Sequence, residues 1–131
     1  MLNINDRVYQ VSTVDLTSEN FDQIIQSNDF VIVDFWAEWC GPCKSFGPVF
    51  EQASENHNDI VFAKVNTENQ MELASHFQIR SIPVLMVFRD QIVIGKVEGA
   101  LSAPDLETLI EKAGTLDMDQ IHHEMQQSKQ D

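Results

Sequence analysis

The stretch VDFWAEWCGPCK (Val33–Lys44) is the part of this sequence that says most about the fold. It joins a continuous apolar run, FVIVDFW (Phe30–Trp36), to a helix-like segment that begins at two cysteines, Cys40 and Cys43. A short apolar run of this kind is typical of a strand that is buried on both faces of a sheet. Both cysteines of the 131-residue chain lie here, with two residues between them. The chain therefore places its whole cysteine content where a buried strand gives way to a helix.

Three explanations are open for this cysteine pair: a metal site, a structural crosslink or a pair of reactive thiols. A structural zinc site needs four ligands, commonly from two paired clusters, and no second pair follows Cys43 at such spacing. A crosslink this short closes a small loop and constrains the unfolded chain little. Redox chemistry is favoured because free N–H groups and the positive end of the helix dipole stabilise a thiolate on Cys40. Cys40 is expected to be the exposed nucleophile, and Cys43, one helical turn later, the buried resolving thiol.

Apolar runs and amphipathic segments alternate along the rest of the chain. Strands are predicted over Arg7–Thr13, Phe30–Trp36, Ile60–Asn66, Val84–Phe88 and Ile92–Val97. Helices are predicted over Thr17–Ser27, Pro42–His57, Gln70–Phe77 and Ser102–Gly114. Thr17 or Ser18 is expected to cap the first helix and Ser102 the last. Strands that alternate with helices and end in a hairpin predict an α/β fold, with a central mixed five-stranded sheet flanked by helices on both faces.

The final segment, TLDMDQIHHEMQQSKQD (residues 115–131), follows a helix that Gly114 is expected to end. We therefore expect one domain over residues 1–114 and a polar, acidic C-terminal extension over residues 115–131. Asp117 is suited to cap a further short helix that carries apolar residues at spacings of three and four. The end of the extension is polar and is expected to fray.

Charge and hydropathy exclude several classes of protein. The chain has 21 acidic and 8 basic residues and a net charge of −13, which repels phosphate groups. No apolar run is long enough to cross a bilayer, and the start, MLNINDRVYQV, has neither the basic nor the apolar region of a secretory signal. We expect a cytoplasmic protein that binds neither nucleic acid nor membrane, in a compartment where structural disulfides are rare.

The quoted stretch resembles the active-site sequence of the thioredoxin family. SIPVL (Ser81–Leu85) resembles the second signature of that family, an isoleucine before a cis-proline. Pro48 matches the proline of the family's long helix, AKVN (Ala63–Asn66) resembles the strand with the family's lysine, and Gly99 falls at its active-site glycine. The resemblance runs from about residue 8 to residue 114 and implies a thioredoxin-like fold with thiol–disulfide chemistry.

The resemblance also implies a role for particular residues. Asp34 would assist proton transfer at Cys43, and Lys64 on the neighbouring strand would be its opposing charge; a purely structural ion pair is the alternative. Burial of Asp34 is expected to raise its pKa, as suits a general base. The residues expected to contact substrate are Trp39, Gly41, Pro42, Ile82, Pro83 and Gly99.

The function predicted is the reduction of client protein disulfides by the Cys-Gly-Pro-Cys dithiol, in electron transport and cell redox homeostasis. The Cys40–Cys43 disulfide would be the only redox group, with no metal or other cofactor. The family pattern implies a separate reductase, an NADPH-dependent flavoenzyme, because this chain has no nucleotide-binding fingerprint. We expect a monomer. The alternative function is an interaction or chaperone-like module whose groove or tail binds partners, with redox activity incidental.

Overall fold

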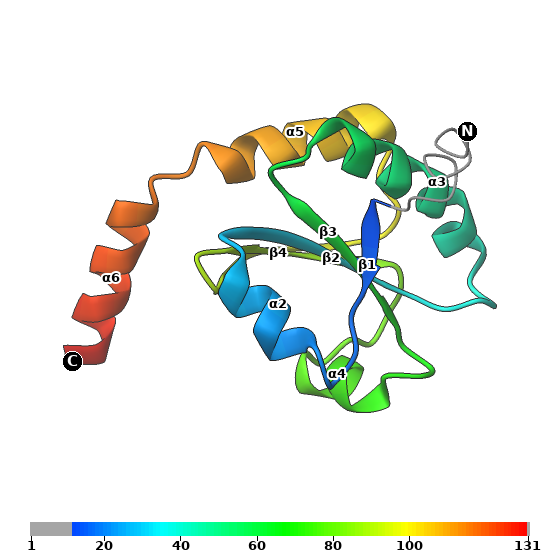
Figure 1. Cartoon of the computed structure of the whole chain (residues 1–131), viewed down its shortest axis with the longest axis horizontal. Helices are drawn as coiled ribbons and strands as arrows, with labels where there is room; N and C mark the ends of the chain where they lie inside the picture. The colour runs from blue at the N-terminus through cyan, green and yellow to red at the C-terminus, as the bar shows by residue number, and fades with distance from the viewer. Residues whose placement is uncertain (1–11, 131) are drawn as a thin grey trace, which may run out of the picture.

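The computed structural model describes residues 12–130. The strands are β1 (Thr13–Asp15), β2 (Phe30–Trp36), β3 (Val61–Asn66), β4 (Val84–Arg89) and β5 (Ile92–Glu98). The helices are α2 (Phe21–Ser27), α3 (Gly41–Asn56), α4 (Met71–His76), α5 (Ala103–Gly114) and α6 (Met118–Gln130). Figure 1 shows the sheet at the centre of the molecule with helices around it.

The five described strands form one sheet in the order β1-β3-β2-β4-β5. β3 runs parallel to both β1 and β2, whereas β4 is antiparallel to both β2 and β5. The sheet is therefore mixed, as predicted, and β2 lies in its middle with a hydrogen-bonded strand on each side.

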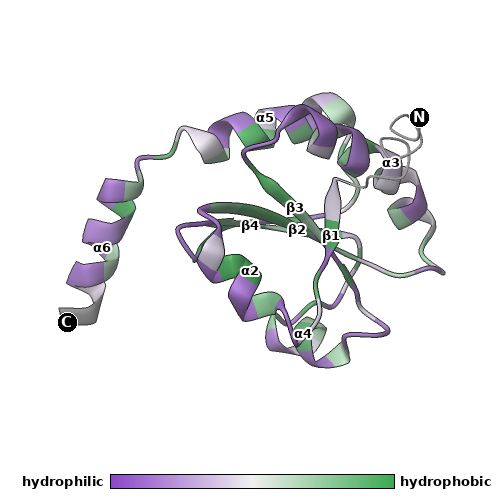
Figure 2. Cartoon of the chain, in the orientation of Figure 1, coloured by the Kyte–Doolittle hydropathy of each residue, from purple (hydrophilic) through white to green (hydrophobic). Residues whose placement is uncertain are grey.

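Two apolar layers cover the two faces of the sheet. One face packs against α2 and α4, and its cluster includes Val31, Val33 and Phe35 from β2. The other face packs against α3 and α5, and its cluster includes Ile32 from β2 with Phe50 from α3. This alternation along β2 follows from the two-residue period of a strand. Figure 2 shows the consequence: apolar colour on the central strands and polar colour on the outer sides of the helices. The prediction of helices on both faces is confirmed.

The first predicted strand and helix are displaced from their predicted positions. Residues 7–11 of the predicted strand lie outside the described residues, and β1 covers Thr13–Asp15. The helix predicted from Thr17 begins at Phe21, with Asn20 as its N-cap and no side-chain cap. Instead, the Thr17 hydroxyl accepts hydrogen bonds from the backbone N–H groups of Glu19 and Asn20, at 3.2 and 3.3 Å. The predicted cap was wrong because this local bonding holds residues 17–20 in a turn before the helix.

The β4–β5 hairpin turns on two residues, Asp90 and Gln91, whose φ angles are 53° and 70°. Two consecutive residues with positive φ match the twist that a two-residue hairpin requires. The turn forms without the glycine usual in such hairpins. The Asp90 N–H donates to the Asp29 carbonyl at 2.8 Å, which ties the turn to the start of β2.

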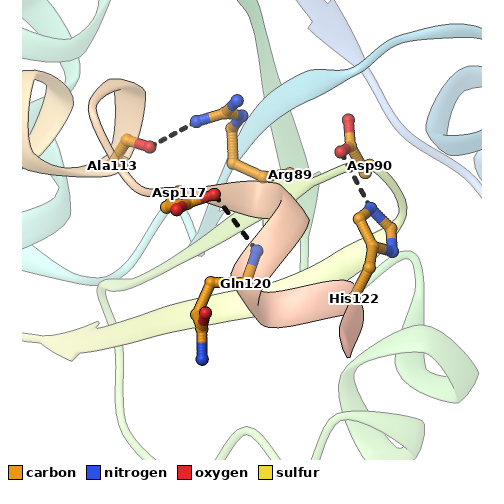
Figure 3. A network of polar contacts seen from close by, with 6 residues as sticks. All are labelled: Arg89, Asp90, Ala113, Asp117, Gln120 and His122. Atoms are coloured by element: carbon orange, nitrogen blue, oxygen red, sulfur yellow. Dashed lines mark hydrogen bonds and ion pairs between the residues drawn. The ribbon is translucent and has the colours of Figure 1, made fainter. Parts of the chain in front are cut away.

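The end of α5 is held by β4. The predicted Ser102 cap of this helix is confirmed, since its hydroxyl accepts from the Asp105 N–H at 3.2 Å. At the other end, the Arg89 guanidinium donates to the Ala113 carbonyl at 2.6 Å (Figure 3). The same guanidinium lies 5.2 Å from the centre of the Phe30 ring. A cation at the C-terminus of a helix also stabilises the helix dipole.

The C-terminal helix α6 is longer than the short helix that the sequence predicts. Asp117 caps it as expected, accepting from the Gln120 N–H at 3.1 Å, and Met118 is buried. Beyond that first turn, the His122 imidazole lies 3.1 Å from the Asp90 carboxylate at the hairpin turn (Figure 3). Met125 stays exposed. The helix therefore touches the body of the protein at its first turn and at the hairpin turn.

Deletion of residues 115–131 is expected to leave a domain that unfolds in one cooperative transition. The free energy of unfolding should fall by about 2 kcal/mol, because the deletion removes the burial of Met118 and one exposed His–Asp contact. Urea denaturation followed by circular dichroism measures this change. A truncated chain without a cooperative transition would show that residues 115–131 belong to the core and that the boundary at Gly114 is wrong.

Candidate active site

The two cysteines lie where β2 has ended and α3 begins. Cys40 is the N-cap of α3 and has extended backbone angles, and Pro42 occupies the first turn of the helix. Proline suits this position because its missing N–H is one that the first turn leaves unpaired. The strand, the short connection and the capped helix therefore fix the backbone on both sides of the pair.

Cys40 and Cys43 form a disulfide, with their Cα atoms 5.3 Å apart. The backbone N–H of Cys43 donates to the Cys40 sulfur at 3.2 Å. A hydrogen-bond donor and a helix N-terminus at a sulfur both favour its thiolate over its thiol. The structure therefore gives the two sulfurs different surroundings and directs the anion-stabilising groups at Cys40.

Both cysteines are buried: Cys40 is 3% exposed and Cys43 is 5% exposed. The prediction that Cys40 is exposed is therefore wrong for the disulfide form. The reason is packing from a distant segment, since the pair lies in a cluster with Ala37, Trp36 and Ile82. The Ile82 carbonyl oxygen is 3.8 Å from the Cys40 sulfur. The position of Cys40 at the start of a helix predicts the backbone groups around its sulfur. It does not predict that the Ile82 segment buries that sulfur.

The predicted substrate-contact residues lie on three segments of the chain, around residues 39–42, 82–83 and 99. The Ile82–Pro83 peptide bond is cis, as the resemblance implied, and the Pro83 carbonyl accepts from the Gly99 N–H at 2.9 Å. Gly99 has φ +97°, a conformation that favours glycine. Gly41 and Pro42 are exposed at the start of α3. Ile82 thus packs against the disulfide, and the Pro83–Gly99 hydrogen bond links its segment to the end of β5.

Trp39 supplies a large exposed apolar surface next to Cys40. Its side chain is 68% exposed, and its indole N–H donates to the Glu68 carboxylate at 2.6 Å. Trp36, by contrast, is partly buried and packs against the cysteine cluster. Glu68 was not predicted as a site residue, because an exposed glutamate after a strand carries no signal in the sequence that separates it from a solvated charge.

Asp34 is buried on β2 without a hydrogen-bond partner for its Oδ1 atom among the described residues. It is 1% exposed and lies on the face of the sheet that α3 covers. Burial raises the pKa of its carboxyl from 3.8 to about 7, while the Lys64 charge lowers that pKa and the Glu51 charge raises it. The group is thus poised to change charge close to neutral pH, which is the condition for a general base.

Lys64 lies beside Asp34 in the register between β2 and β3. Its ammonium, however, pairs with Glu51 of α3, at 3.4 Å, and lies 5.3 Å from the centre of the Trp36 ring. No ion pair within 4.0 Å joins Lys64 to Asp34 in residues 12–130. A buried Asp34–Lys64 ion pair, the structural alternative, is therefore absent from this form. Glu51 was missed because nothing in its spacing distinguishes it from the other charges on the outer side of α3.

Within the part of the chain that the structure describes, no three His, Cys, Asp or Glu side chains are grouped as a metal ion would require. Within the same residues, no helix combines the length and the apolar character that crossing a membrane demands.

Comparison with known sequences gives the family. The thioredoxin family model matches residues 12–112. A putative thioredoxin 2 from Streptomyces coelicolor is 56% identical over 110 residues, which span 84% of this chain and 82% of that protein. A thioredoxin from Alicyclobacillus acidocaldarius is 47% identical over 79 residues, which span 60% of this chain and 75% of that protein.

Solved structures of thioredoxins share the fold of this chain. A mutant thioredoxin from Halobacterium salinarum superposes with a TM-score of 0.74 at 31% identity, covering 82% of this chain and 96% of that one. The thioredoxin of Plasmodium falciparum gives 0.72 at 38% identity, covering 76% and 98%. This chain belongs to the thioredoxin family. It is a thiol–disulfide oxidoreductase that reduces protein disulfides through its Cys-Gly-Pro-Cys dithiol.

Replacement of Asp34 by asparagine is expected to change stability in a pH-dependent way. Below about pH 4 the carboxyl is protonated in both folded and unfolded chains and contributes no charge penalty. As the pH rises from about 4 to about 7, the carboxyl ionises in the unfolded wild type but stays protonated in the folded one, so the wild type loses stability over this range and Asp34→Asn does not. The free energy of unfolding of the variant, relative to that of the wild type, should therefore rise by up to about 4 kcal/mol between about pH 4 and about pH 7.

Urea denaturation of both proteins at a series of pH values measures this gain. The buried amide of the asparagine adds an offset that does not vary with pH, so only the change across the series counts. A difference in stability that is constant from acid to neutral pH would contradict the raised pKa of Asp34.

Proposed function

We propose that Cys40 is the nucleophile and Cys43 the resolving thiol of the reductase. The Cys40 thiolate attacks one sulfur of a client disulfide, which forms a mixed disulfide and releases the first client thiolate. The Cys43 thiolate then attacks the Cys40 sulfur, which forms the Cys40–Cys43 disulfide and releases the second client thiolate. Two electrons pass from the dithiol to the client. The observation that carries this order is the Cys43 N–H donating to the Cys40 sulfur at 3.2 Å.

Asp34 is proposed as the base that takes the proton of the Cys43 thiol. Its support is a carboxyl with a pKa of about 7, buried on the face covered by α3, whose Oδ1 atom accepts no hydrogen bond from the described residues. Lys64 is the opposing charge that favours the ionised carboxylate. A base with a pKa near neutral is in good part ionised at neutral pH and still accepts a proton readily.

We assign client binding to the rim of the disulfide. Trp39 offers a flat apolar contact, and the Ile82 backbone lies beside the Cys40 sulfur, where an extended client segment would pair as an added strand. The remaining proposed contact residues are Gly41, Pro42, Pro83 and Gly99.

The cellular setting is also part of the proposal. The protein acts as a cytoplasmic monomer in electron transport and cell redox homeostasis, with no metal or other cofactor. A separate NADPH-dependent flavoenzyme returns the oxidised form to the dithiol. The net charge of −13 supports clients that are proteins, since it disfavours nucleic acid and anionic membrane surfaces.

Alkylation of the reduced protein near neutral pH should modify Cys40 about tenfold or more faster than Cys43. The reason is that the helix N-terminus and the Cys43 N–H stabilise the Cys40 thiolate. Iodoacetamide labelling followed by peptide mass spectrometry measures the two rates. Equal rates, or faster reaction at Cys43, would remove the basis for the two roles.

Replacement of Cys43 by serine should trap the mixed disulfide. With insulin as a defined client, Cys43→Ser is expected to accumulate a covalent adduct at Cys40 that dithiothreitol releases. Cys40→Ser is the matched control and should accumulate no such adduct. Adducts of equal yield in both variants would contradict the proposed order. Binding of insulin that persists in both variants without any covalent adduct would favour an interaction module instead.

A further inference from the structure

The Lys64 ammonium contacts two groups other than Asp34, the Glu51 carboxylate and the Trp36 ring. The Lys64 side chain is 16% exposed and the Glu51 side chain, its partner at 3.4 Å, is 50% exposed. The same ammonium lies 5.3 Å from the centre of the Trp36 ring. Two contacts therefore fix the end of a side chain whose four-carbon stem is otherwise flexible.

Asp34 is the group that this arrangement leaves without a partner. Asp34 and Lys64 are register neighbours on adjacent strands, so their side chains leave the same face of the sheet. Yet no hydrogen bond reaches the Asp34 Oδ1 atom among the described residues. A lysine released from Glu51 would find an unpaired carboxylate within the span of its own side chain.

We propose that Glu51 is a positioning residue of the reductase: it holds the Lys64 ammonium over Trp36 and away from the Asp34 carboxylate. This proposal deepens the role of Asp34 as base and rests on it for its effect on the reaction. Glu51 touches neither the cysteines nor Asp34 through any hydrogen bond or ion pair in the described structure. Its positioning effect acts through Lys64, in addition to the direct effect of its own charge on Asp34.

Three elements of the described structure lie next to Asp34. β3 contributes Lys64, β4 places the apolar Leu85 opposite Asp34, and α3, which covers this face of the sheet, carries Glu51. Lys64 and Glu51 are the two charges that act on the pKa of Asp34, in opposite directions. A substitution of the half-exposed Glu51 therefore changes the pKa of Asp34 without altering its burial.

Loss of the Glu51 charge should lower the pH at which Asp34 ionises. The substitution removes a negative charge that opposes ionisation, and it frees Lys64 to approach and favour the carboxylate. Both effects have the same sign. Because the Glu51–Lys64 contact is partly exposed and screened by solvent, the expected change is about half a pH unit.

The experiment follows the Asp34 carboxyl carbon by NMR as the pH of the oxidised full-length protein is varied. Glu51→Gln is expected to move the midpoint downward by about half a pH unit. Glu55→Gln is the matched control, since it removes the same charge one turn further along the exposed side of α3. An unchanged midpoint in Glu51→Gln, or an equal change in Glu55→Gln, would overturn the proposal.

A second comparison tests whether Glu51 acts through Lys64. In a Lys64→Met background, adding Glu51→Gln should move the midpoint by less than half as much as it does in the wild type. An equal change of the midpoint in both backgrounds would show that Glu51 acts on Asp34 through its own charge alone, which contradicts a positioning role.

The reduction of insulin by the same variants separates this proposal from the proposed base. If Asp34 is the base, the pH profile of Glu51→Gln moves with the NMR midpoint. If the NMR midpoint moves while the rate profiles of wild type, Glu51→Gln and Asp34→Asn coincide, the role of Asp34 as base fails. The positioning of Lys64 by Glu51 would still stand.

Discussion

A carboxyl group buried on the central strand is the constraint on which the rest of the site depends. Asp34 sits between two hydrogen-bonded strands and under α3, where an unpaired charge is expensive. The protein does not pair the charge at close range; burial raises the pKa of the group to about 7 instead. The same burial that costs stability from about pH 4 upward supports the proposed role of Asp34 as a base that titrates near neutral pH.

The reactive pair is assembled from segments that only the fold brings together. The end of β2 and the N-cap of α3 set the backbone of Cys40, while the loop at Ile82 covers its sulfur. Trp39, directly before Cys40 in the chain, has a largely exposed side chain. The pair is therefore shielded from solvent yet bordered by an apolar surface, an arrangement that suits attack on a disulfide presented by a docked protein rather than by a small molecule.

Much of this could be predicted from the sequence because it depends on local pattern. The apolar run Phe30–Trp36 has the observed bounds of β2, and the Ser102 cap has the observed hydrogen bond. What failed depends on contacts between distant segments or on competing local bonds. The burial of Cys40 comes from a loop some forty positions later, and the start of α2 is delayed by the turn at Thr17. The Glu51–Lys64 contact joins a helix to a strand, and no periodicity encodes it.

The central claim is that Asp34 delivers its effect in the second chemical step, when Cys43 attacks the mixed disulfide. The most direct test is the single-turnover rate of that step in wild type and Asp34→Asn, measured by rapid quench from about pH 6 to about pH 8. The account predicts a wild-type rate that rises with a midpoint near the Asp34 pKa of about 7, and a slower variant that lacks this inflection. Coincident profiles for the two proteins would contradict it and leave Asp34 with a structural role alone.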